Sequence, residues 1–152
     1  KDLLNPDTPK EIFSWCVENN VDVQILVNNV GLGSAGSFED TTMEFDVCLV
    51  KLNIFPMIQL TKLFLPTLKE FKRSYILNMS SLGSYRPIPY KALYTASKAF
   101  IYSFSKSAFN ASSRIGKNIL QKMIWIGSTR SNRTLIVPIF YGTTTYRPHP
   151  KS

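Results

Sequence analysis

The sequence is poor in the side chains that most often bind transition metals. Cys16 and Cys48 are the only cysteines among 152 residues, and His149 is the only histidine. Two isolated thiols are typical of buried, reduced cysteines, and a lone histidine between prolines has no partner for catalysis. We therefore expect neither a disulfide nor a metal site.

Long apolar runs are missing too. No stretch of about 18 uncharged apolar residues occurs, which argues against a membrane span. The first residues lack the apolar core and the small-residue cleavage site of a signal peptide. We therefore expect a cytoplasmic protein with no membrane span in this segment.

Acidic residues stop at Glu70. Residues 71–152 contain thirteen Lys or Arg and no Asp or Glu, and the whole chain carries a net charge of +8. A basic half can bind phosphates or nucleic acid. These cations are scattered singly, however, without a recognised nucleic-acid motif. We expect no nucleic-acid partner, and a phosphate-bearing cofactor or an atypical C-terminus explains the charge equally well.

Apolar patterns alternate between helical and extended spacing, which predicts an α/β domain with a parallel sheet. Thr8 is expected to cap the first helix, and Pro56 is expected to kink or break the second. The expected elements are a helix from Thr8, a strand at Val23–Val27, a helix from the capping box Thr41-Thr42-Met43-Glu44 to about Phe71, a strand at Ser74–Met79, a helix from about Tyr90 and a strand at Asn118–Trp125.

The third predicted helix carries Tyr94 and Lys98, four residues apart and therefore on one face. An ammonium beside a phenol stabilises the phenolate and lowers the tyrosine pKa, so the pair can exchange a proton with a carbonyl or alcohol. Ser81, at the end of the second strand, could hold the same oxygen. Taken alone, this Tyr–Lys spacing is more typical of a solvated helix face.

Two further stretches carry polar residues at suggestive positions. Asn28-Asn29-Val30-Gly31 follows the first strand, where open parallel sheets bind ligands, although an ordinary turn fits the same residues. Asn53 lies three residues before Pro56. It could bind backbone groups freed by the proline, bind a water, or be packed by local hydrogen bonds.

Together these stretches resemble the short-chain dehydrogenase/reductase family from Asp2 to about Ser131. Asn28–Gly31 resembles its Asn-Asn-Ala-Gly element, and Ser81, Tyr94 and Lys98 fall at its catalytic spacing. The neighbourhood of Tyr94 is most similar to a broad bacterial branch related to hydroxysteroid and 3-oxoacyl reductases. Further matching positions are Asn53, an Ile126–Thr129 turn similar to Pro-Gly-x-x-Thr, and an Asp2-Leu3 pair similar to the adenine-contacting aspartate.

The resemblance implies an NAD- or NADP-dependent oxidoreductase acting on a small-molecule carbonyl or alcohol, and a homo-oligomer. Tyr94 would be the general acid/base, supported by Lys98, with Ser81 holding the substrate oxygen and Asn53 holding a water. Asn28 would steady the sheet. The residues expected to bind the cofactor are Asp2, Asn29, Val30, Gly31, Tyr94, Lys98, Gly127 and Thr129.

The family's Gly-rich turn, Thr-Gly-x-x-x-Gly-x-Gly, does not occur in these residues. We therefore expect a partial Rossmann-like, doubly wound parallel sheet that lacks the first strands and this loop. Residues 1–131 would be the C-terminal part of the domain, and residues 132–152 an atypical tail. The residue that selects NAD or NADP would lie in the missing part. The alternative is an inactive fragment that acts as a structural or oligomerising remnant.

Overall fold

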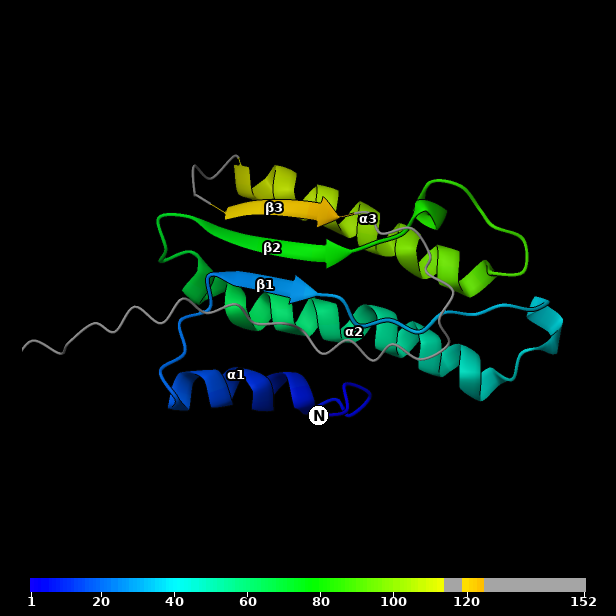
Figure 1. Ribbon diagram of the computed structural model, residues 1–152, viewed down its shortest axis with the longest axis horizontal. Coiled ribbons are helices and arrows are strands. Elements are labelled where there is room, and N and C mark those ends of the chain that lie inside the picture. Colours follow the sequence, from blue (N-terminus) through cyan, green and yellow to red (C-terminus); the bar gives the residue numbers. More distant parts are fainter. Residues whose placement is uncertain (114–118, 125–152) are drawn as a thin grey trace, which may run out of the picture.

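The computed structural model describes residues 1–113 and 119–124. It contains a parallel sheet with strand order β1-β2-β3 and three α-helices (Figure 1). The predicted alternation of helices and strands is confirmed. In chain order the elements are α1 (Thr8–Glu18), β1 (Ile25–Asn28), α2 (Met43–Leu68), β2 (Ser74–Met79), α3 (Ala92–Ser113) and β3 (Ile119–Ile124), with short 3-10 turns η1 (Phe38–Asp40) and η2 (Leu82–Ser84).

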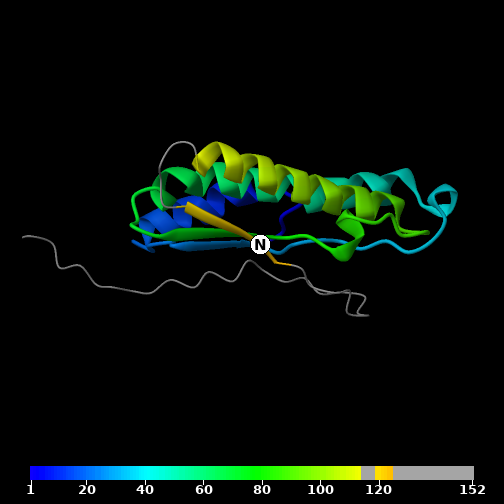
Figure 2. The ribbon, with the colours of Figure 1, turned by 90° about the horizontal axis from the view of Figure 1, so that it is seen from above.

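The three α-helices cover one face of the sheet (Figure 2). Each strand adds to the sheet on the same side of its predecessor, since β1 pairs with β2 and β2 pairs with β3. Right-handed crossovers that advance in one direction place their helices on one face. The described residues therefore form a singly wound part of the predicted doubly wound sheet.

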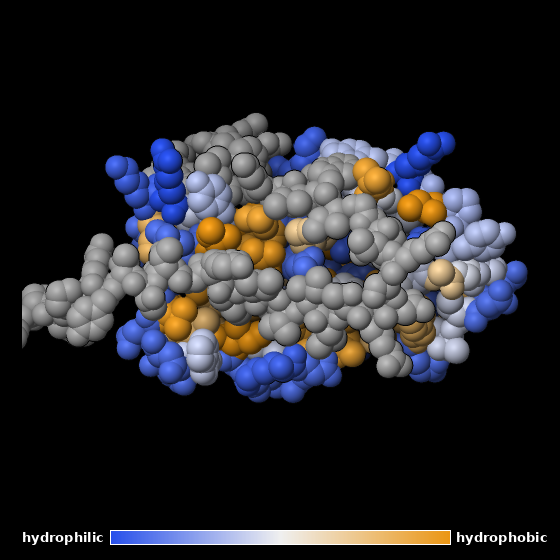
Figure 3. Space-filling view, in the orientation of Figure 1, coloured by the Kyte–Doolittle hydropathy of each residue, from blue (hydrophilic) through white to orange (hydrophobic). Residues whose placement is uncertain are grey.

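The other face of the sheet is apolar. Ile25 and Val27 on β1 and Tyr75 and Leu77 on β2 are half-buried, and they alternate with the buried residues that face the helices. Figure 3 shows apolar side chains gathered across the middle of this side of the molecule. Strands that are apolar on both faces are typical of parallel sheets.

The core lies between the sheet and the helices α1 and α2. Phe64 of α2 is 2% exposed and meets Phe13 of α1 edge-on, with ring centroids 5.1 Å apart. Leu26 of β1 and Ile76 of β2 complete this layer from the sheet side. Cys16 lies in the same cluster, and burial raises the pKa of its thiol. Cys16 is thus buried as expected, whereas Cys48 is only half-buried.

The structure differs from two local predictions, the cap of α1 and the break at Pro56. Thr8 is the first residue of α1 rather than its cap, because its hydroxyl donates to the carbonyl of Asp2. α2 runs without a break through Pro56 and Pro66, since packing of its buried face outweighs the backbone bonds that each proline removes. The cap of α2 is Thr42, the second residue of the predicted capping box, and its hydroxyl accepts from the backbone of Phe45.

Helix α2 is long and apolar enough to cross a membrane when judged by length and composition alone. Core helices of globular domains often meet the same criterion. Here the buried residues of α2, including Leu49, Leu60 and Leu68, pack within the fold. This packing favours a core helix, and the expected lack of a membrane span stays a prediction.

A chain of buried polar side chains crosses the core. Asn28 of β1 donates from Nδ2 to Asn78 Oδ1 on β2 at 2.8 Å and to Thr61 Oγ1 on α2 at 3.2 Å. Asn78 in turn donates to Ser105 Oγ on α3 at 2.9 Å. Asn28 and Asn78 are paired in the strand register. This chain links both strands to both helices and gives Asn28 the sheet-steadying contacts expected of it.

Candidate active site

Lys98 is held beneath the C-terminal end of β2. Its side chain is 6% exposed, and its Nζ donates to the carbonyl of Met79 at 2.9 Å. Ser80 Oγ donates to the carbonyl of Lys98 at 2.9 Å, which ties this turn of α3 to the strand end. Burial lowers the pKa of Lys98 to about 8. An ammonium is thus fixed where the strand ends.

Tyr94 lies one helical turn before Lys98. The Nζ of Lys98 is 5.8 Å from the centroid of the Tyr94 ring, so the predicted shared face is confirmed. The tyrosine side chain is half-buried, unlike the solvated pair that the spacing alone would favour. A positive charge therefore lies beside the tyrosine ring, on the same face of α3.

Asn53 of α2 makes long-range hydrogen bonds in place of the local ones considered from the sequence. Its Oδ1 accepts from the backbone of Leu32 at 2.6 Å, and its Nδ2 donates to the carbonyl of Leu32 at 3.0 Å and to Ser97 Oγ at 2.9 Å. The side chain is 1% exposed. Asn53 therefore joins the loop after β1 to the helix that carries Tyr94.

Gly31 lies between these groups. A Cβ built at Gly31 would be 3.3 Å from both Asn53 Oδ1 and Lys98 Nζ. The end of β1, Asn53 and Lys98 therefore meet at one point. Because Gly31 is exposed on its other side, a bound molecule can approach the backbone there.

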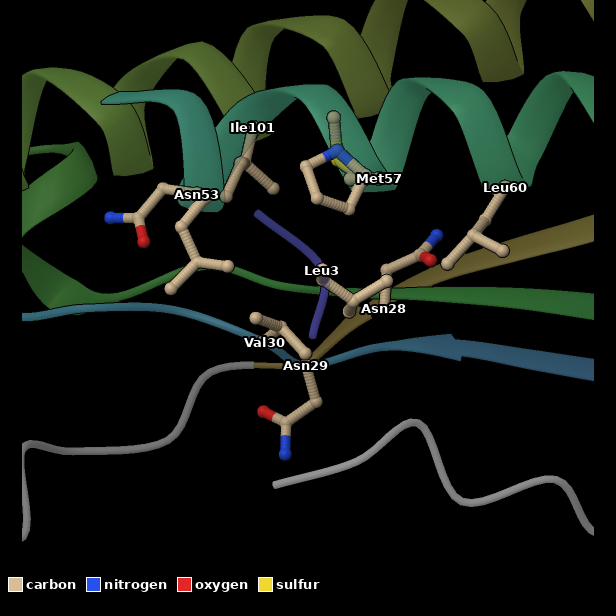
Figure 4. A pocket seen from close by; sticks show the side chains of 10 residues that line it. Leu3, Asn28, Asn29, Val30, Asn53, Met57, Leu60 and Ile101 are labelled. Carbon is tan, nitrogen blue, oxygen red and sulfur yellow. The ribbon is translucent and has the colours of Figure 1, made fainter. Parts of the chain in front are cut away.

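A small pocket lies beside this point. It is lined by residues from the end of β1, from α2 and α3, and by Leu3 near the N-terminus. In Figure 4 the side chain of Asn28 points toward α2, whereas Asn29 points to the other side of the sheet. Val30 also lines the pocket. Two of the predicted cofactor-binding residues, Asn29 and Val30, are thus at the strand end.

Ser81 is the second residue after β2, close to the strand end as predicted, and caps the short turn η2. Its Oγ accepts from the backbone of Gly83 at 3.2 Å, and the side chain is 4% exposed. A Cβ built at Gly83 would be 2.9 Å from Thr95 Cγ2, so this turn packs tightly against α3 next to Tyr94. Convergence of the Ser81 and Tyr94 hydroxyls on one substrate oxygen stays a prediction.

The remaining predicted cofactor contacts are untested. Asp2 is exposed, and its carboxylate accepts from the backbone of Leu4 at 2.9 Å. Its neighbour Leu3 lines the pocket beside β1. Gly127 and Thr129 lie outside the described residues, as does the segment 132–152.

Sequence reasoning missed several residues that position the site. Ser80 and Ser97 fix α3 to the end of β2 and to Asn53, respectively. Gly83 allows η2 to approach α3. Each is a small residue beside a predicted site residue, and this adjacency was the only signal in the sequence.

Stability is expected to rise with pH because of Lys98. The ordinary pKa of 10.5 applies in the unfolded chain, whereas burial lowers it to about 8 in the fold. The unfolded chain therefore binds more protons between these values. Below pH 8 the burial of the charged ammonium lowers the free energy of unfolding by its full amount. This destabilisation disappears as the pH rises to about 10.5. The full shift corresponds to about 3 kcal/mol.

Urea unfolding at pH 7.5 and 10.5 measures this effect. Relative to a Lys98→Met variant, the unfolding free energy of the wild-type protein should increase by about 2 to 3 kcal/mol between these two pH values. The exposed Lys62 of α2 provides the matched control, since Lys62→Met should behave as wild type does. Parallel pH profiles for wild type and Lys98→Met would contradict the assignment.

The family model described as short chain dehydrogenase matches residues 1–134. The chain belongs to the short-chain dehydrogenase/reductase family. The resemblance drawn from Asn28–Gly31, Ser81, Tyr94 and Lys98 is thereby confirmed at the level of the family.

Several curated relatives share part of their length with this member of the family. A 3-ketodihydrosphingosine reductase of Bacteroides thetaiotaomicron is 28% identical, over 70% of this chain and 39% of the relative. The 17-beta-hydroxysteroid dehydrogenase type 3 of Mus musculus is 36% identical, over 66% and 34%. A very-long-chain 3-oxoacyl-CoA reductase of Laccaria bicolor is 39% identical, over 58% and 27%. The chain thus matches less than half of each relative.

Solved structures of the family share the fold. A short-chain dehydrogenase/reductase from Burkholderia phymatum in complex with NAD aligns with a TM-score of 0.77 at 18% identity, over 84% of this chain and 46% of that one. A metagenomic short-chain oxidoreductase in complex with NADP aligns with a TM-score of 0.74 at 26% identity, over 84% and 57%. Both nicotinamide cofactors therefore occur among its structural relatives.

Proposed function

We propose that this chain carries the catalytic part of an NAD(P)-dependent oxidoreductase that interconverts a carbonyl and an alcohol. The observation that carries the proposal is the meeting of Tyr94, Lys98, Asn53 and Gly31 at the C-terminal ends of β1 and β2. In open α/β sheets this edge is where ligands bind. Family membership supports the same reaction class.

The residues at the strand end fit the nicotinamide half of the cofactor. Gly31 leaves the backbone open beside Lys98, and the buried Lys98 Nζ can donate to a ribose hydroxyl as well as to Met79. A nicotinamide supplies or accepts the hydride when it is bound. Nothing in the described residues selects between NAD and NADP.

Proton transfer is assigned to Tyr94. In reduction its phenol donates the proton to the substrate oxygen, and in oxidation the phenolate accepts it. Lys98, one helical turn away, supports this transfer with its positive charge. Ser81 Oγ accepts from the backbone of Gly83, which leaves its O–H to donate to the substrate oxygen. Asn53 holds the loop and the helix in register and supports a water in the proton relay.

A lipid-like carbonyl is the proposed substrate class. The relatives include proteins named for 3-ketodihydrosphingosine, hydroxysteroid and 3-oxoacyl-CoA substrates. The loop between β2 and α3 exposes Leu82, Tyr85, Ile88 and Tyr90, an apolar set beside the site. Such a surface suits an apolar chain or ring better than a sugar.

The 152-residue chain is expected to bind NADH and NADPH weakly, with a dissociation constant above the micromolar range. The sequence lacks the Gly-rich turn whose backbone amides hold the pyrophosphate in this family. Titration followed by nicotinamide fluorescence measures the affinity. Sub-micromolar binding would contradict this expectation and would mean that other residues hold the phosphates.

The second candidate function is a non-catalytic remnant that only associates with other chains. The exposed aromatic side chains of Phe55 on α2 and Phe100 on α3, which another chain could cover, are the observation that favours it. Turnover separates the two functions: an enzyme consumes NADH or NADPH with a ketone at millimolar cofactor, and a remnant does not. A homo-oligomer and a cytoplasmic location stay predictions under both.

A further inference from the structure

Two ammonium groups flank the ring of Tyr94. The Nζ atoms of Lys91 and Lys98 are each 5.8 Å from its centroid. Lys91 directly precedes α3, and its carbonyl accepts from both the backbone N–H and the hydroxyl of Thr95 at 2.9 Å. The backbone that carries Lys91 is therefore fixed relative to Tyr94.

The two lysines differ in burial and in hydrogen-bond partners. Lys98 is buried and donates to Met79, whereas Lys91 is half-buried and keeps contact with solvent. Residues 71–152 contain no Asp or Glu, and the ion pair found among the described residues joins Lys1 to Glu11, far from this site in the sequence. No carboxylate within the described part of the chain therefore neutralises Lys91.

We propose that Lys91 binds an anionic group of the substrate beside the reacting carbonyl. This inference rests on the proposed function, because it places the carbonyl oxygen at the Tyr94 hydroxyl. A carboxylate one or two carbons from that carbonyl lies within reach of a lysine that already contacts the same ring. The protein would prefer 3-oxo acids over neutral ketones, and neutral ketones over 2-amino ketones.

The preference has an electrostatic cause. An anion near Lys91 gains a charge-assisted hydrogen bond in a partly desolvated site. An ammonium on the substrate would instead meet two like charges that no acidic residue offsets. Lys91 is thus assigned as a specificity-determining residue, separate from the proton donor.

The test compares three probes of equal chain length: 3-oxodecanoate, methyl 3-oxodecanoate and 1-aminodecan-2-one. Lys91→Gln should lower kcat/KM for 3-oxodecanoate about tenfold, as expected for one charged hydrogen bond, and change the methyl ester less than about twofold. Lys91→Arg, which keeps the charge, should restore most of the preference. An equal loss with acid and ester would show a merely structural role and overturn the inference.

Lys106 supplies the matched control. Its Nζ is 5.2 Å from the Tyr102 ring centroid, the same kind of contact two turns along α3, and Lys106→Gln should leave all three activities unchanged. Failure of the wild type to reduce any probe would overturn the proposed function. Binding of 3-oxodecanoate, followed by NMR shifts, would then decide the inference: weaker binding by Lys91→Gln supports it, and equal binding overturns it.

Discussion

Replacing Tyr94 with phenylalanine is expected to lower kcat/KM for carbonyl reduction about a thousandfold, within the usual range for loss of a general acid. The substitution removes the hydroxyl but keeps the ring that contacts Lys91 and Lys98. The fold should therefore persist. The measurement is NADH or NADPH consumption at millimolar cofactor, so that weak cofactor binding does not hide the effect.

Tyr75 provides the matched control for this experiment. It is half-buried on β2, on the face of the sheet away from the helices and from the proposed site, so Tyr75→Phe should keep near wild-type turnover. Unfolding curves of both variants check that the structure is intact. A Tyr94→Phe variant with more than about a tenth of wild-type activity would remove Tyr94 from the role of proton donor.

The largest expected effect on stability comes from Asn78. Asn78→Ala should lower the unfolding free energy by about 3 kcal/mol, combining lost buried hydrogen bonds with a small cavity. Asn78 is 0% exposed, accepts from Asn28 at 2.8 Å and donates to Ser105 at 2.9 Å. The alanine would leave polar groups on both neighbours with fewer partners.

Urea unfolding at pH 7 measures this loss. Asn29→Ala is the matched control, because Asn29 is half-buried and points away from the helices (Figure 4). That variant should change stability by less than about 1 kcal/mol. A similar small change for Asn78→Ala would mean that the buried polar chain contributes little to the fold.

The helices and strands could be predicted because the spacing of apolar residues along the chain determines them locally. Apolar runs bounded by polar residues marked β2 without error, and β3 lies within the strand predicted at Asn118–Trp125, whose two end residues are outside the described residues. The start of α3 was less accurate, because Tyr90 adopts a left-handed φ of 63° that no helical pattern reveals. At Pro56 the sequence predicted a kink or a break, but tertiary packing keeps α2 continuous through this residue.

The site was predictable only in part, for a different physical reason. Tyr94 and Lys98 are four residues apart, so their shared helix face follows from local geometry, and the structure confirms that face. The partners of Asn53 are 21 and 44 residues away in the sequence, and no local pattern encodes them. Lys91 looked like one scattered cation until its contact with Tyr94 was visible.

The parallel connections have a consequence for folding. Asn28 and Asn78 meet across neighbouring strands although 50 residues separate them, so the loop that their pairing closes contains the whole of α2. Closing such long loops is costly and slow. The strand ends that carry Gly31 and Ser81 can be brought together only after this step. The reacting centre is therefore assembled late, and a local opening of β1 from β2 would dismantle it while α2 and α3 remain helical.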